Sequence, residues 1–286
     1  MSFYHTSPFQ NVLDDALLQC KNEAVEVNKR ELEWLLEAAT QTTRIQRITG
    51  TMAPLPHDWQ VIFSAFLKRR LLGEPVQYIL GTGAFYGREF QVTSDVLIPR
   101  PETEQLVEWA ILKLGRTSSP NILDIGTGSG CIAVTLALEI SRSRVTAIDV
   151  SSAALEVAKM NAATLEVEVN FERVDVFSDG TPVGPFELVI SNPPYVPLVE
   201  KLHIQREVIG FEPHIALFAG EDPLIFYKRI AAISKARLTS SGMVAVEIHA
   251  EYGRQVRSIF EAYGYSNVAV IKDLAGKDRF VTAGVD

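Results

Sequence analysis

Cysteine is scarce in this chain, since Cys20 and Cys131 are the only two among 286 residues. Two cysteines cannot build a disulfide framework or a cysteine metal cluster, and such sparse use is typical of a reducing compartment. The five histidines are scattered without the spacing of metal ligands, so we expect no metal site. These shortages together predict a cytoplasmic protein that holds no metal ion.

An excess of positive charge is also missing. The formal net charge is −8, which does not favour a broad attraction to nucleic acid or to an anionic membrane. No apolar run approaches the length of a membrane span, and Met1–His5 has the layout of neither a secretion signal nor an organelle presequence. We expect no direct DNA binding and no membrane association, and we expect the chain to be a monomer.

The length of the chain fits two unequal domains. Residues 1–82 predict a small helical bundle, because apolar side chains recur at helical spacing, for example between residues 32 and 39. Asn28 followed by Glu31 resembles a capping box, and Asp58 is expected to cap a later helix. No residue type in this part of the chain indicates catalysis.

Alternating apolar residues come after the helical part. Glu89–Val92 and Val96–Ile98 predict the strands of a β-hairpin, so we expect residues 83–98 to form a hairpin linker between two domains. Pro101 is then placed at the first position of a helix with an acidic first turn.

We expect residues 99–286 to form an α/β domain. From residue 121 onward, apolar runs of strand length alternate with helical segments, which implies a mostly parallel sheet with helices on both faces. We expect seven strands, the last two antiparallel, near residues 121–125, 145–149, 169–174, 186–191, 243–248, 267–272 and 279–284. This Rossmann-like layout is that of one broad class of methyltransferases.

A glycine loop comes directly after the first of these strands. Glycines at 126, 128 and 130 would let a ligand approach the backbone closely. A pyrophosphate fingerprint requires a glycine where Cys131 stands, and Asp124 would repel a pyrophosphate, which counts against a nicotinamide-dependent oxidoreductase. A carboxylate suits the cationic S-adenosylmethionine instead. The candidate cofactor contacts are Asp124, Ile125, Gly126, Thr127 and Gly128.

Carboxylates also end the next two predicted strands. Asp149 can accept hydrogen bonds from both hydroxyls of a ribose, and Asp175 and Val176 would border an adenine. A solvated helix cap is the alternative role for each carboxylate alone. Three carboxylates at successive strand ends, with a glycine loop between strand and helix, favour a nucleoside cofactor.

The tetrapeptide Asn192-Pro193-Pro194-Tyr195 comes after an apolar strand. Two prolines remove two amide donors and stiffen the bend, which leaves carbonyl oxygens, a carboxamide and an aromatic ring at the carboxyl end of the strand. The Asn192 oxygen and a nearby carbonyl could accept both hydrogens of a planar –NH2 group while Tyr195 covers its face. A loop after a core strand, without any such role, is the alternative.

These motifs make the sequence similar to the release factor glutamine methyltransferases, the family that modifies the glutamine of the Gly-Gly-Gln motif in peptide chain release factors. The similarity runs from about Gly73 to the C-terminus. It rests on Gly73–Tyr78, Leu97–Glu104, Asp124–Gly130, Ser191–Tyr195 and Phe211–Pro213. At two positions where the family usually has a glycine, this sequence has Pro223 and His249 instead.

The resemblance implies S-adenosylmethionine as cofactor, with Leu97 against it and Asn192 also in contact with it, and a release factor as partner. It implies that Asn192, Pro193 and Tyr195 act in catalysis, with Pro194 also holding the target glutamine. Residues 1–82 would be the docking domain and residues 99–286 the catalytic domain. Two alternatives stay open, an amino-methyltransferase acting on adenine N6 or guanine N2 of a nucleic acid, and a non-catalytic cofactor-binding scaffold.

Overall fold

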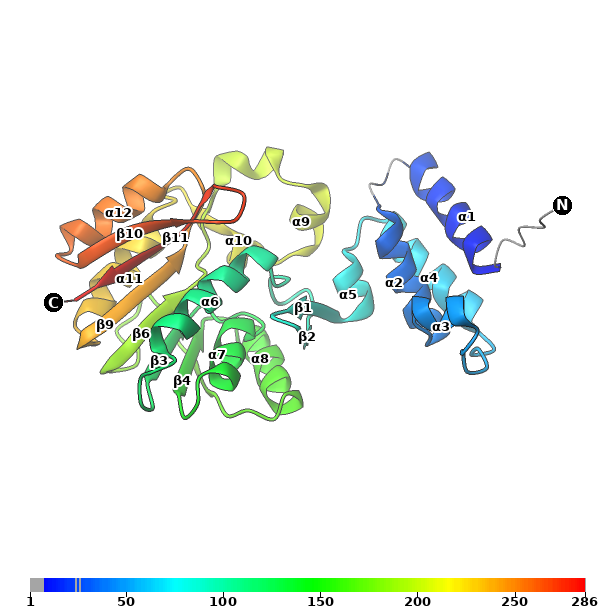
Figure 1. Cartoon of the computed structure of the whole chain (residues 1–286). Coiled ribbons are helices and arrows are strands. Elements are labelled where there is room, and N and C mark those ends of the chain that lie inside the picture. The colour runs from blue at the N-terminus through cyan, green and yellow to red at the C-terminus, as the bar shows by residue number, and fades with distance from the viewer. Residues whose placement is uncertain (1–7, 24, 26, 286) are drawn as a thin grey trace. The chain divides into compact units, whose positions relative to one another are not determined.

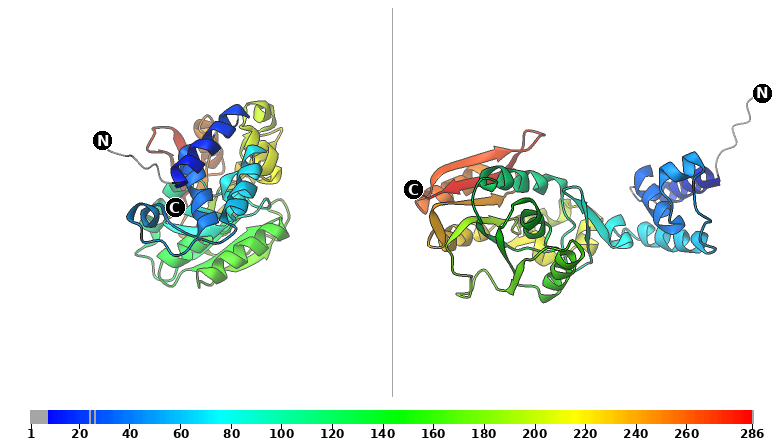
Figure 2. Two further views of the ribbon diagram at one scale, coloured as in Figure 1. Left: turned by 90° about the vertical axis from the view of Figure 1, so that its right-hand side faces the viewer. Right: turned by 60° about the horizontal axis from the view of Figure 1, so that its bottom comes forward.

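A computed structural model describes residues 8–23, 25 and 27–285 of the chain (Figures 1 and 2). The chain divides into two compact units. The first comprises Met1–Gly81 with Gln205–Phe211, and the second comprises Thr82–Ile204 with Glu212–Asp286. The segment 205–211 thus leaves the second unit, and the chain returns to that unit after it.

The first unit is helical, as predicted. Its helices are α1 (Pro8–Asn22), α2 (Lys29–Thr40), α3 (Arg44–Thr49), α4 (Trp59–Leu71), α5 (Val76–Leu80) and α9 (Arg206–Phe211). Its core is formed by buried side chains at helical spacing, among them Leu13, Leu32, Leu35, Leu36, Phe63 and Leu67. Burial of this apolar stripe holds the short helices together, because isolated helices of such length are marginal in water.

Polar contacts in this unit confirm one cap and contradict another. The Asn28 side chain accepts a hydrogen bond from the Glu31 amide at 3.0 Å, as expected of a cap. Asp58 precedes α4 but makes no side-chain cap bond, so that expectation is wrong. The buried guanidinium of Arg70 pairs with Glu31 at 2.9 Å and with Glu207 at 3.0 Å, which fastens α9 to the helical unit.

The second unit begins with a β-hairpin, in which the strand predicted at Glu89–Val92 is found within one residue as β2 but the partner strand is not the predicted one. Strands β1 (Thr82–Phe85) and β2 (Arg88–Gln91) are antiparallel and are joined by a tight turn with positive φ at Tyr86 and Gly87. The strand expected at Val96–Ile98 is wrong. The amide of Val96 donates to the Thr93 carbonyl instead of to a neighbouring strand.

The main sheet has seven strands, as predicted. They are β3 (Asn121–Ile125), β4 (Arg144–Asp149), β5 (Asn170–Arg173), β6 (Phe186–Ser191), β9 (Leu238–Glu247), β10 (Ser266–Lys272) and β11 (Asp278–Gly284). Their spatial order is β10-β11-β9-β6-β3-β4-β5, and β11 alone runs in the direction opposite to the other strands of the sheet. The central strands β3 and β6 are buried along nearly their whole length because both faces of the sheet are covered.

Helices cover the two faces of this sheet (Figures 1 and 2). Side chains of α6 (Pro101–Leu114), α7 (Cys131–Glu139) and α8 (Ser152–Thr164) belong to one buried cluster, together with Phe85 and Phe90 of the hairpin. Side chains of α11 (Ile225–Lys235) and α12 (Gly253–Ala262) belong to the cluster on the other face. The sheet is therefore the middle layer of three.

The long connection after β6 carries short elements. They are β7 (Val196–Pro197), the 3-10 helix η1 (Leu198–His203), α10 (His214–Leu217) and β8 (Phe218–Gly220), and β7 pairs with β8. The helix α6 begins at Pro101 with Glu102 and Glu104 in its first turn, as predicted. The Glu104 carboxylate also accepts a hydrogen bond from the Tyr86 amide at 2.8 Å, which fastens the hairpin turn to α6.

Candidate active site

A cavity of about 290 Å³ lies in the second unit at the carboxyl ends of the parallel strands. It has walls from segments that are far apart in the sequence, at the sheet edge where open α/β folds bind ligands. Of the predicted site residues, those that line it are Leu97, Ile125, Gly126, Thr127, Gly128, Asp149, Asp175, Val176, Asn192, Pro193 and Pro194. Asp124 and Tyr195 are not among the lining residues.

The glycine loop connects β3 to α7 in a conformation that requires glycine. Gly126, Gly128 and Gly130 all have positive φ, at 73°, 55° and 79°. A Cβ on Gly130 would lie 3.0 Å from the Cβ of Ala158, whereas a Cβ on Gly126 or Gly128 would meet nothing within 4 Å. Gly130 thus serves the packing of helix α8, and the other two glycines leave open space beside the cavity.

Asp149, at the end of β4, holds the glycine loop from the neighbouring strand. Its Oδ2 accepts from the Gly128 amide and its Oδ1 from the Ser151 amide, both at 2.9 Å. Burial raises the pKa of this carboxyl, and these amide hydrogen bonds oppose the rise. A carboxylate has about four acceptor positions, so Asp149 keeps capacity for further donors from the cavity.

Asp124 lies beneath the glycine loop and is fully buried. Its Oδ2 accepts from the Thr127 hydroxyl at 2.7 Å, whereas its Oδ1 has no hydrogen-bond partner among the described residues. Burial raises the pKa of Asp124 to about 7, with the charge of Asp149 adding to the rise. A buried acid with an unpartnered oxygen favours its protonated form until a cation or donor reaches it.

The end of the cavity beside β5 is lined by apolar side chains and by the carboxylate of Asp175. Val176 is buried, and the ring of Phe177 packs edge-on against Phe226 with centroids 5.1 Å apart. Asp175 accepts from the Phe177 amide at 2.9 Å. Arg229 holds this loop from α11, because its Nε donates to the Val176 carbonyl at 2.6 Å. The combination of flat apolar surfaces and an acceptor suits an aromatic base with an amino group.

The opposite wall is formed by the segment from Leu97 to Arg100. The Arg100 guanidinium pairs at 2.6 Å with Glu212, whose side chain is buried. The same carboxylate accepts from the Ile98 amide at 3.4 Å. Glu212 therefore holds this segment against the cavity, which is why Val96–Ile98 does not form a strand. Glu212 stands in a motif of the family, but the sequence indicated no role for its side chain.

The tetrapeptide at the end of β6 divides between the cavity and the interior. Asn192 and the two prolines line the cavity, and the Asn192 amide nitrogen donates to the Thr103 hydroxyl at 3.2 Å. Tyr195 packs against the buried cluster instead, and its hydroxyl donates to Glu247 at 3.3 Å. Tyr195 follows the lining residue Pro194 without lining the cavity itself, and its role beside the target group stays a prediction.

Two polar residues of this region were not identified as site residues from the sequence. Thr103 and Glu247 are both buried, and the Thr103 hydroxyl donates to Glu247 at 2.6 Å. Thr103 belongs to the Leu97–Glu104 block, one of the motifs on which the family resemblance rests. The sequence indicated no role for the Thr103 side chain. Glu247 ends β9 inside an apolar run. A single carboxylate in such a run was the sequence signal by which this residue could have been found.

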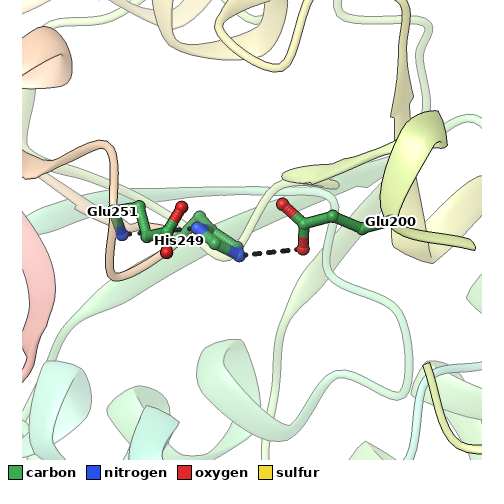
Figure 3. Close-up of side chains that lie close together, drawn as sticks. All are labelled: Glu200, His249 and Glu251. Atoms are coloured by element: carbon green, nitrogen blue, oxygen red, sulfur yellow. Dashed lines mark hydrogen bonds and ion pairs between the residues drawn. The ribbon is translucent and has the colours of Figure 1, made fainter. Parts of the chain in front are cut away.

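Glu200, His249 and Glu251 bring their ligand atoms within 4.8 Å of one another (Figure 3). The Nδ1 of His249 accepts from the Glu251 amide at 3.3 Å, and its Nε2 faces Glu200 at 3.3 Å. An accepting Nδ1 places the imidazole proton on Nε2, where it is donated to Glu200. Nε2 is then occupied by a proton, so this arrangement favours a hydrogen-bonded pair over a metal ligand.

Two protein families match this chain in different parts. The family described as "Methyltransferase small domain" matches residues 103–210, and the family described as "PrmC N-terminal domain" matches residues 11–81. None of the helices formed by the described residues is long and apolar enough to cross a membrane.

Curated relatives match along most of the chain. A protein of Flavobacterium psychrophilum named "Release factor glutamine methyltransferase" is 38% identical over 86% of this chain and 88% of its own length. A protein of the same name from Koribacter versatilis is 40% identical over 95% of this chain and 96% of its own. Identity at this level over nearly the full length of both chains indicates common descent.

Two solved structures resemble this chain, and one of them supports the fold. A methyltransferase from Pyrococcus furiosus is 18% identical, with a TM-score of 0.51 over 77% of this chain and 98% of its own, which supports the fold alone. A release-factor-specific protein-(glutamine-N5) methyltransferase from Alicyclobacillus acidocaldarius is 32% identical, with a TM-score of 0.43 over 69% of this chain and 99% of its own.

Proposed function

This chain belongs to the family of release factor glutamine methyltransferases, and we propose on that premise that it transfers a methyl group from S-adenosylmethionine to the side-chain amide nitrogen (N5) of a release factor glutamine. The target would be the glutamine of the Gly-Gly-Gln motif. The observation that carries the proposal is the position of Asn192 and Pro193 in the wall of a cavity whose other end suits a nucleoside.

The residues of the cavity fit S-adenosylmethionine. The open space beside Gly126 and Gly128 leaves room for the methionine part, and Asp149 keeps acceptor capacity for ribose hydroxyls. Val176 and Asp175 suit an adenine, and Leu97 would lie against the cofactor. The Asp124 carboxyl below the loop would ionise when the cationic cofactor binds and would then supply negative potential. When bound, the cofactor supplies an electrophilic methyl group on a sulfonium.

The amide nitrogen of glutamine is a poor nucleophile because its lone pair is delocalised. The Asn192 Oδ1 and a carbonyl of the proline bend would accept its two hydrogens, which increases electron density on nitrogen and stabilises the positive charge that develops there. Holding the nitrogen in line with the methyl group that it attacks, to which this pair of acceptors would contribute, can supply about 7–11 kcal/mol of the barrier. Asn192 acts by polarising and positioning and does not take up a proton. The nitrogen becomes acidic as it is methylated, so it would release one hydrogen to water without a strong base.

The helical unit is proposed to dock the release factor, with residues 1–82 as docking domain, 83–98 as linker and 99–286 as catalytic domain. The match of residues 11–81 to a family N-terminal domain supports this division. We also propose that the protein acts in the cytoplasm as a monomer. Light scattering of the purified protein tests the monomer directly.

Mass spectrometry of a release factor incubated with this protein and S-adenosylmethionine tests the proposed reaction. We expect a gain of one methyl group on the glutamine of the Gly-Gly-Gln motif. Tritiated cofactor offered separately to release factor, DNA and RNA tests the alternative of a base amino-methyltransferase. Transfer to DNA or RNA without transfer to the release factor would overturn the proposal.

A further inference from the structure

A chain of hydrogen bonds runs from Asn192 into the interior of the second unit. The Asn192 Nδ2 lies 3.2 Å from the Thr103 Oγ1, which lies 2.6 Å from the Glu247 Oε2. The other carboxylate oxygen of Glu247 accepts from the Tyr195 hydroxyl at 3.3 Å. One buried carboxylate thus reaches both ends of the Asn192–Tyr195 tetrapeptide.

The order of donors and acceptors in this chain fixes the orientation of the Asn192 carboxamide. An ionised carboxylate only accepts, so the single hydroxyl proton of Thr103 is directed to Glu247. The Thr103 oxygen then offers only lone pairs to Asn192, and a lone pair requires the NH2 end of the carboxamide. The oxygen of the carboxamide is left for the other side, and Asn192 lines the cavity.

We propose that Thr103 and Glu247 are positioning residues that hold the Asn192 carboxamide with its oxygen toward the substrate. This inference rests on the proposed function, since that oxygen is the acceptor for a hydrogen of the glutamine amide. With the carboxamide reversed, an NH2 group would face the NH2 group of the substrate, and two donors would repel each other.

The surroundings of Glu247 allow it to accept as a carboxylate. Burial raises its pKa to about 7, and the hydrogen bond from Thr103, the charge of Arg279 and the hydrogen bond from Tyr195 oppose this rise. Arg279 reaches the region from β11, where it pairs with Asp273 at 2.8 Å. Glu102 in the first turn of α6 adds a like charge that raises the pKa further.

Two matched pairs of variants test the inference. Thr103→Val removes the hydroxyl but keeps the shape of the side chain, and Thr103→Ser keeps the hydroxyl. Glu247→Met removes the acceptor of the Thr103 proton, which frees that proton to bind the Asn192 oxygen and reverse the carboxamide. Glu247→Gln keeps a carbonyl acceptor. Each pair tests the same orientation independently, so one pair suffices if a variant of the other does not fold.

The measurements are kcat, the KM for the release factor and the Kd for S-adenosylmethionine. We expect kcat of Thr103→Val and Glu247→Met to fall about 10- to 100-fold, which is less than the roughly 10²- to 10³-fold found when a group that contacts the reacting atoms is itself removed, because these residues act through Asn192. Thr103→Ser and Glu247→Gln should keep kcat within about threefold, and the Kd for the cofactor should stay within about twofold in all four variants.

Two results would overturn the inference. One is a kcat for Thr103→Val within about threefold of Thr103→Ser, with both proteins folded. The other is a loss that lies in the cofactor Kd or in KM while kcat is unchanged, because that pattern indicates a structural role. A wild-type protein that does not methylate release factors at all would instead refute the proposed function, and the inference with it.

Discussion

The most informative perturbation of the unliganded protein is Asp124→Asn, because this buried carboxyl is costly to ionise. Its pKa is raised from the ordinary 3.8 to about 7 by burial. At about 1.4 kcal/mol for each pKa unit, ionising Asp124 in the folded protein costs on the order of 4 kcal/mol more than in the unfolded chain.

The two pKa values give the sign of the pH dependence. Between about pH 4 and pH 7 the folded protein holds the Asp124 proton whereas the unfolded chain has released it. The free energy of unfolding therefore falls as the pH rises through this window, by at most about 1.4 kcal/mol per pH unit from this group. Asn has no such titration, so the variant lacks this part of the decline.

Urea unfolding of the wild type and of Asp124→Asn at pH 5, 6, 7 and 8, without cofactor, measures the effect. We expect the stability of the variant relative to the wild type to increase from pH 5 to pH 7 and to level off above it. Glu247, whose pKa is also raised to about 7, is present in both proteins and cancels in the difference. The comparison uses the change with pH, so a constant penalty from the new amide does not affect it.

Asp179→Asn serves as the matched control, because Asp179 is exposed in the same unit. Its curve should run parallel to that of the wild type. Parallel curves for Asp124→Asn as well, or a relative stability that falls with rising pH, would refute the reasoning about the buried carboxyl.

Three further outcomes are expected. Asn192→Ala should lower turnover about 10²- to 10³-fold in the release factor assay while the melting temperature stays nearly constant, and turnover within tenfold of the wild type would contradict its role. Asp149→Ala should weaken cofactor binding in calorimetry, since each charge-assisted hydrogen bond contributes about 1.5–3 kcal/mol, and an unchanged Kd would count against ribose binding. Asn161→Asp should lower the urea midpoint, because the side-chain nitrogen of Asn161 donates to the carbonyl of Gln91 in the hairpin and to that of Ser129 in the glycine loop. An unchanged midpoint would show that this link does not stabilise the unit.

Much of the fold was predictable because its signals are local. The strands buried on both faces, such as Asn121–Ile125 and Phe186–Ser191, each contain a short run of consecutive apolar residues. The glycine loop was also predictable. Its backbone has positive φ at Gly126 and Gly128, and such positions are usually occupied by glycine. Because both the glycine loop and the Asn192–Tyr195 bend come directly after parallel strands, their place at the ligand edge of the sheet was predictable too.

The errors arose where a distant partner decides the conformation. Val96–Ile98 alternates like a strand, but the Ile98 amide bonds to Glu212, a residue 114 positions later. Thr103 and Glu247 are 144 positions apart and meet because the helix α6 packs against the strand β9. Periodicity reports which face of an element is buried, and it carries no information about which buried polar group lies opposite.

The sequence by itself determined the elements of this protein, the glycine loop, the stiff bend at Asn192–Tyr195 and the order in which acidic residues end the strands. Only the tertiary structure decided that Asp124 lies beneath the glycine loop, that Tyr195 turns inward and that Thr103 and Glu247 reach Asn192. The physical reason is that backbone propensity acts between neighbours in the chain, whereas the burial of a charge and its hydrogen-bond partners depend on how the strands and helices pack.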